Sequence, residues 1–215
     1  MSRNEEERWK EDVAIHESGH EAVALELGVP LGLVSIRPGA HFAGVAFHGS
    51  TRVRKADTFK WTSPVLQPAS LRRYVETSIM VALGGDLAAR YYGPIETGYV
   101  ATKTDDSLEA ERLASILTEM PATDREVARL AASESEERMP VYDEEKAQEL
   151  ATFLSPVGTG PVFLEWLRAE TGELLKTAHM GRMVRALAAA LLDREVIGAR
   201  AARTILKEAR DGKGV

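Results

Sequence analysis

AIHESGHEAVA, the stretch from Ala14 to Ala24, decides how this chain of 215 residues folds. It lies inside a longer run, Glu5 to Leu27, in which apolar residues and histidines recur at steps of three and four. That spacing is typical of one face of an α-helix. The face consists of Trp9, Val13, His16, His20, Val23 and Leu27. Gly28 and Pro30 then end the run. The sequence therefore predicts one amphipathic helix with two histidines on its inward face.

The centre of this helix, His16-Glu17-Ser18-Gly19-His20, has the pattern HExxH. Residues four apart lie on the same helix face, so both imidazoles can reach one zinc ion at about 2.0–2.1 Å. Zinc lowers the pKa of a bound water to about 7, and Glu17 can then act as the base that takes the proton and passes it to the departing amine. The alternative is a surface helix with two incidental histidines. We favour the metal, because polar imidazoles on an inward face need partners.

The overall composition narrows the class of protein. There is no cysteine, so any metal must be held by His, Asp or Glu. The net charge of −6 argues against a nucleic-acid binder, which would carry a concentrated basic face. Residues 1–10 are polar, unlike a secretory signal, and no apolar run approaches the roughly 18 residues that span a bilayer. We expect a cytoplasmic protein with no membrane insertion.

The rest of the chain predicts a small sheet and several helices. We expect short strands over Leu33–Arg37 and Gly44–His48, as a hairpin or as neighbours, because both alternate and a Pro-Gly pair lies between them. A helix is expected from Leu71 to about Tyr92. Its Gly84-Gly85 pair would weaken the helix unless another element packs very close, and Gly19 likewise leaves room for a close neighbour.

Helices dominate the second half. They are expected from Asp106 to about Glu119, in a charged segment over residues 122–155, and from Val162 to about Arg210 with breaks near Thr171-Gly172 and Ile197-Gly198. The fold class is therefore mainly α with a small β-sheet, α+β. We expect a single domain over residues 1–215, with the zinc site in residues 1–120 and a helical C-terminal part in residues 121–215.

A catalytic zinc site needs a third protein ligand beside two histidines. The other histidines are His41, His48 and His179, and none has a distinguishing context. Asp105 and Asp106 open a predicted helix. However, Asp106 followed by Glu109 also fits a capping box, which satisfies free backbone amides without any metal. Local sequence alone leaves the two interpretations of Asp106 evenly balanced.

These residues resemble a known family. The stretch Ala14 to Ala24 is similar to the start of the FtsH peptidase domain, in which a helical HEAGHAxxA segment holds zinc. Further similar stretches follow in the family's order: Val34–Pro38 with Gly44-Val45, Val81–Gly85 with Ala88-Ala89, Thr97-Gly98 with Asp106, Ala110, Leu113 and Ala114, and Leu191–Glu195 with Ile205-Leu206. The resemblance covers most of the chain and implies a zincin-like helix in an FtsH-peptidase-like helical bundle.

The resemblance also implies the roles of individual residues. It implies Zn²⁺ on His16, His20 and Asp106, with Glu17 as the catalytic base. It further implies that the strand around Gly44–His48 is a sheet edge to which an extended peptide adds as a further strand. Extra residues between Gly98 and Asp106 keep Asp105 open as the third ligand. The acidic residues that follow the family's LGG element are here Ala89 and Arg90.

The ATPase of the family is missing from this chain, which contains no GxxxxGK[ST] loop. We therefore expect a zinc metallopeptidase, a hydrolase that acts on peptides or unfolded proteins without ATP. One alternative is a catalytically weak or inactive relative that binds peptides or regulates. Another is a peptidase partner of a separate ATPase chain. Assembly into a homo-oligomer stays open.

Overall fold

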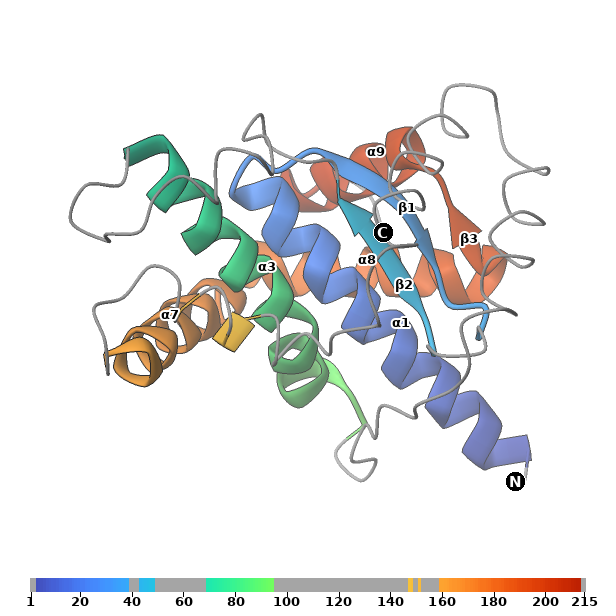
Figure 1. Ribbon diagram of the computed structural model, residues 1–215. Helices are drawn as coiled ribbons and strands as arrows, with labels where there is room; N and C mark the ends of the chain where they lie inside the picture. The colour runs from blue at the N-terminus through green and yellow to red at the C-terminus, as the bar shows by residue number, and fades with distance from the viewer. Residues whose placement is uncertain are drawn as a thin grey trace, which may run out of the picture.

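The computed structural model describes residues 3–38, 43–48, 69–94, 147–148, 151 and 159–213. Within these ranges it has five α-helices and a three-stranded antiparallel sheet, so the mainly helical α+β class is confirmed. Helix α1 (Arg3–Glu26) runs through the centre of the molecule, with α3 (Ala69–Tyr92) on one side and the sheet on the other (Figure 1). None of the described helices is both long and apolar enough to cross a bilayer.

The sheet has the order β2-β1-β3, with β1 (Leu31–Ser35) between β2 (Val45–His48) and β3 (Val196–Ile197). Both pairings are antiparallel, which confirms that the first two strands are neighbours. Strand β1 begins and ends two residues earlier than predicted. Its five residues are all buried, so the alternation on which that prediction depended does not mark its ends. In the described part of the chain, β2 is an edge strand.

Three helices follow near the C-terminus: α7 (Gly160–Leu175), α8 (Ala178–Arg194) and α9 (Ala199–Arg210). The helix break predicted near Thr171-Gly172 lies further along the chain, at Lys176 and Thr177, and both predicted residues lie inside α7. A Cβ on Gly172 would lie 2.9 Å from the hydroxyl oxygen of Tyr91. This glycine therefore accommodates a neighbouring side chain and does not end the helix.

The break predicted near Ile197-Gly198 is confirmed, and Gly198 is the N-cap of α9. The sequence analysis did not predict that Val196 and Ile197 form a strand there. They pair with Ser35 and Val34 of β1, a contact that local sequence does not reveal. The helix predicted over residues 106–119 lies outside the described residues. Of the segment 122–155, only residues 147, 148 and 151 are described, and these are helical.

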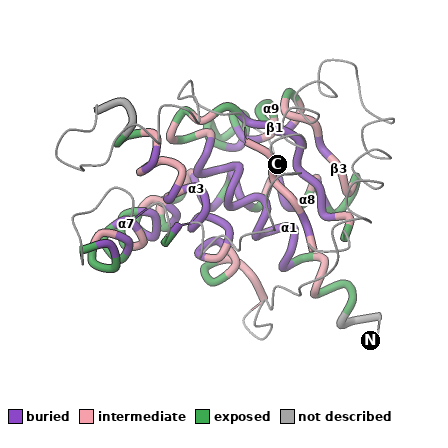
Figure 2. The backbone as a smooth tube through the Cα atoms, viewed as in Figure 1, coloured by how far each residue is buried: buried purple, intermediate pink, exposed green. Residues whose placement is uncertain are grey.

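Helices α1 and α3 approach each other closely through glycine. A Cβ on Gly19 would lie 2.4 Å from both the Cβ of Ala88 and the carbonyl oxygen of Gly84. Neither helix could keep this position with a larger residue there. The prediction that these glycines mark close packing is confirmed. As a result the middle of α1 is buried on every side, as Figure 2 shows.

Candidate metal centre

The buried part of α1 contains an unusual number of polar side chains. Six of them are less than 6% exposed: Asp12, His16, Glu17, Ser18, His20 and Glu21. Burying polar groups is unfavourable unless they are paired, so such a run needs a function or a set of partners. The alternative of a surface helix with incidental histidines is wrong, because both histidines lie in the interior.

His16 and His20 face each other through one nitrogen each. Their Nε2 atoms are 3.0 Å apart, and the rings meet edge to face with centroids 4.7 Å apart. Two nitrogens on one tetrahedral zinc, each about 2.0–2.1 Å from it, would be roughly 3.3 Å apart. The observed separation is close to that of a ligand pair. The helical spacing of four residues brings the two rings together, as the sequence predicted.

The second nitrogen of each ring faces an oxygen atom of α3. His20 Nδ1 donates to the carbonyl oxygen of Val81 at 2.7 Å, which leaves Nε2 with the lone pair that a metal requires. His16 Nδ1 lies 3.4 Å from Oδ1 of Asp86. Metal-binding histidines typically have a carbonyl or carboxylate partner of this kind, which orients the ring. Helix α3 supplies both partners.

Gly85 of α3 keeps the space beside the two Nε2 atoms open. A Cβ at this position would lie 2.4 Å from Nε2 of His20 and 2.7 Å from Nε2 of His16. Any side chain would therefore displace both rings. The two nitrogens, the tautomer of His20 and this space together fit a metal ion held by His16 and His20.

Glu17, the predicted base, lies next to the first histidine and is 4% exposed. The chain passes over it where β2 begins. A Cβ on Gly44 would lie 2.8 Å from Oε1 of Glu17. The carboxylate thus lies between α1 and the residue that precedes the edge strand.

The predicted third ligand, Asp106, and its alternative, Asp105, lie outside the described residues, as does His41. Within the described ranges, no group of three His, Asp or Glu side chains could hold a metal ion. His179 instead pairs with Glu26 at 3.7 Å. His48 lies beside the site but directs Nε2 toward Glu21. The described part of the chain therefore supplies two ligands, and the third stays a prediction.

Two acidic residues of this region were missed by the sequence analysis. Burial raises the pKa of Glu21 well above its usual 4.5, with His20 acting in the opposite direction and Glu17 raising it further. Burial, with a smaller effect of Glu11, raises the pKa of Asp12 to about 6. Their helical spacing was a usable signal, since Asp12 lies four residues before His16 and Glu21 four after Glu17.

No family model and no curated protein matches this sequence. The resemblance to FtsH peptidases therefore depends on the order of the motifs quoted above.

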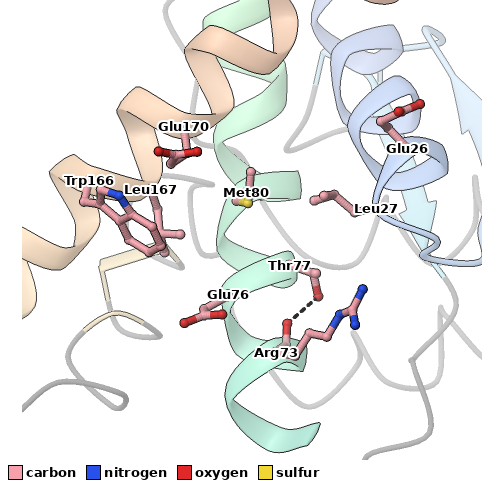
Figure 3. Close-up of a pocket in the computed structure, with 9 residues that line it drawn as sticks. All are labelled: Glu26, Leu27, Arg73, Glu76, Thr77, Met80, Trp166, Leu167 and Glu170. Atoms are coloured by element: carbon pink, nitrogen blue, oxygen red, sulfur yellow. Dashed lines mark hydrogen bonds between the residues drawn. The ribbon is translucent and has the colours of Figure 1, made fainter. Parts of the chain in front are cut away.

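One cavity in the described structure lies elsewhere (Figure 3). It has a volume of about 280 Å³ and lies between the end of α1, the first half of α3, and α7. Its lining consists of Glu26, Leu27, Arg73, Glu76, Thr77, Met80, Trp166, Leu167 and Glu170. No histidine contributes to it, so this cavity is distinct from the candidate metal centre.

Proposed function

We propose that this chain is a zinc-dependent peptidase that hydrolyses peptide bonds in short or unfolded polypeptides without ATP. The observation that carries the proposal is the pair of buried Nε2 atoms, 3.0 Å apart, in the space that Gly85 leaves open. His16 and His20 would hold the zinc, with Asp106 as the third ligand. The third ligand rests on the family resemblance and not on the described geometry.

Zinc, when bound, supplies a water of lowered pKa and polarises the carbonyl of the peptide. Glu17 accepts the proton of the attacking water and delivers it to the departing amine. The position of Glu17 suits this role, because it follows His16 directly in α1 and its carboxylate lies against Gly44, just before β2 begins. A substrate in extended form would lie along the side of β2 that pairs with no described strand, where main-chain hydrogen bonds would hold it.

The direct test is Glu17→Gln, which keeps the size of the side chain and removes the base. We expect peptide cleavage to fall by about 10²–10⁴-fold, with zinc content unchanged. Glu26→Gln, on the exposed end of the same helix, is the matched control and should cleave like the wild type. Cleavage by Glu17→Gln at the wild-type rate would show that the assigned base is wrong.

A parallel metal analysis addresses the third ligand. Zinc per chain is measured for the wild type, Asp106→Ala and Asp105→Ala, each purified without added metal. We expect Asp106→Ala to lose zinc and Asp105→Ala to keep it. If both variants keep their zinc, the third ligand lies at another residue.

The enclosure of Glu17, which is 4% exposed, favours a second candidate function. In this case the chain is a peptide-binding or regulatory relative that holds zinc without turning substrate over. It predicts zinc occupancy and measurable peptide binding, with no hydrolysis across a broad peptide library. The same library, with cleavage followed by mass spectrometry, separates the two candidates.

A further inference from the structure

Glu21 is a buried carboxyl that the proposed reaction does not use. Its side chain is fully buried, and neither oxygen has a hydrogen bond among the described residues. Oε1 faces Nε2 of His48 at 3.4 Å. Leaving a carboxyl in this position is unfavourable by itself, so its retention needs a reason. The FtsH motif HEAGHAxxA has Ala where this chain has Glu21, so the resemblance does not supply one.

His48 is the last residue of the edge strand β2 and lies beside the metal-binding imidazoles. Its ring meets that of His20 at a centroid distance of 6.3 Å and an angle of 69°. The three imidazoles of His16, His20 and His48 thus follow one another in a row. His16 is almost fully enclosed, whereas the side chain of His48 is 19% exposed. Of the three rings, that of His48 is the one that solvent reaches most.

The chain at strand β2 lies against both Glu17 and Glu21 of α1. Its start covers Glu17 through Gly44, and its end places His48 against Glu21, one helical turn further along α1. A peptide lying along β2 would therefore pass the base and then the imidazole of His48. Nε2 of His48 faces the carboxyl of Glu21 at 3.4 Å, so the carboxyl is placed where it can orient the ring. A neutral imidazole carries one N–H, so His48 donates to a substrate through Nδ1 when Nε2 accepts from the carboxyl of Glu21.

We propose that His48 is a further catalytic residue of this site, donating a hydrogen bond to the carbonyl oxygen of the bond being cleaved, and that Glu21 is the positioning residue that orients it. The inference rests on the proposed peptidase function. Negative charge develops on that oxygen as the carbonyl carbon becomes tetrahedral. A donor placed in advance stabilises this charge more in the transition state than in the ground state.

The test compares His48→Ala, His48→Phe and His48→Gln by steady-state kinetics on an internally quenched peptide. We expect kcat of the Ala and Phe variants to fall by about 10²–10³-fold, with KM changed far less. His48→Gln retains a donor and should recover part of kcat. Glu21→Gln should lower kcat by a smaller factor. His48→Phe keeps the volume of the ring, so it tests the donor in a variant whose packing is preserved.

Two readouts other than activity separate catalysis from packing. Zinc per chain should be unchanged in every variant. The affinity for a phosphinic peptide, which mimics the tetrahedral state, should fall in proportion to kcat/KM, whereas the affinity for an uncleaved product peptide should not. His179→Ala is the matched control, because His179 forms a pair with Glu26 on the same helix, and it should behave like the wild type.

The outcomes are distinguishable. An active wild type together with equally active His48→Ala and His48→Phe contradicts this inference alone. Loss of zinc from both His48 variants also overturns it, because His48 would then be a ligand. A wild-type protein that binds zinc but cleaves no peptide contradicts the proposed function and, with it, a catalytic role for His48.

Discussion

Helices α1 and α3 pack differently at the two ends of their contact. At one end the backbone of α3 packs against the imidazoles of α1, whereas at the other end the two helices border a cavity of about 280 Å³. The difference lies in the residues of α3. Gly85 permits an approach that would place a Cβ within 2.7 Å of Nε2 on His16 and His20. Further along the pair, α3 presents Thr77 and Met80, whose side chains line the cavity. Close approach in this helix pair is therefore confined to the glycines, and the candidate metal centre lies there.

Helix α1 also carries the glutamates of two Glu–His pairs, and the two pairs differ in burial. Glu21 and His48 are 3.4 Å apart, with the glutamate fully buried. Glu26 and His179 are 3.7 Å apart, and about a third of each side chain is exposed. Similar distances thus occur with very different burial. An exposed pair is screened by water and contributes little, whereas a buried pair is unfavourable to break and is retained where a function requires it.

The largest expected effect comes from filling the space at Gly85. In Gly85→Ala the new Cβ would displace both imidazoles. We therefore expect zinc affinity to fall by about 100-fold or more, because losing even a hydrogen-bond partner that only orients a metal ligand lowers affinity by up to that factor. Gly84→Ala is the matched control. Its Cβ would lie 3.0 Å from Cγ2 of Val23 and would not reach the rings.

Both glycine variants should unfold at lower temperature than the wild type, because each introduces a close contact. Only Gly85→Ala should lose zinc in a competition titration with a chelator. Equal zinc affinity in the two variants would mean that the close approach of α3 at Gly85 does not affect metal binding.

An intermediate effect concerns Asp12, where the buried part of α1 begins, and it appears as a dependence of stability on pH. The pKa of Asp12 is raised from 3.8 to about 6. The folded state therefore binds more protons than the unfolded state between these values, and the stability of the metal-free protein falls as pH rises from about 4 to about 6. Asp12→Asn removes this decline. It should be more stable than the wild type at pH 7, on the order of 1–3 kcal/mol, with no gain near pH 3.

Urea unfolding of the metal-free proteins at several pH values measures this dependence. Asp193→Asn, a change at a surface carboxylate whose side chain is 78% exposed, is the control and should leave the curve of stability against pH unaltered. If Asp12→Asn and the wild type give curves of the same shape, burial does not perturb Asp12 and the contrast in burial along α1 is weaker than the structure indicates.

The smallest effect is expected at the exposed pair. Glu26→Gln removes the charge that faces His179, and we expect the free energy of unfolding to change by only about 0–1 kcal/mol. Thermal unfolding at low and high salt measures it, and the difference from the wild type should shrink as salt increases. A larger loss of unfolding free energy would mean that the exposed pair contributes as much as a buried one, which would contradict the contrast between the two Glu–His pairs.

Several features could be predicted from the sequence because they depend on local periodicity. The HExxH helix, its end near Gly28 and the helix that contains Gly84 and Gly85 follow from patterns within a few turns of chain. The break predicted near Thr171-Gly172 lies instead at Lys176 and Thr177, because a glycine inside a helix can serve packing as well as termination. Strand β3 was missed since two residues carry no pattern of their own.

Within the candidate site, the sequence also predicted that His16 and His20 share one face with Glu17 beside them. It did not predict the roles of Asp86 and Glu21. Asp86 belongs to a helix whose apolar pattern is complete without it. Glu21 lies four residues after Glu17, but that spacing alone does not reveal what its carboxyl contacts. Their partners, His16 and His48, come from other elements of the fold.

By itself, the sequence determined that one turn of helix carries two imidazoles and a carboxylate, because a spacing of four residues places side chains on one face whatever surrounds them. Only the tertiary structure decided which groups meet that face. The carbonyl of Val81 that orients His20 is 61 residues away along the chain, and Gly85 and His48 reach the same place from separate elements. Such contacts arise from the packing of α1 against α3 and β2, which no local pattern encodes.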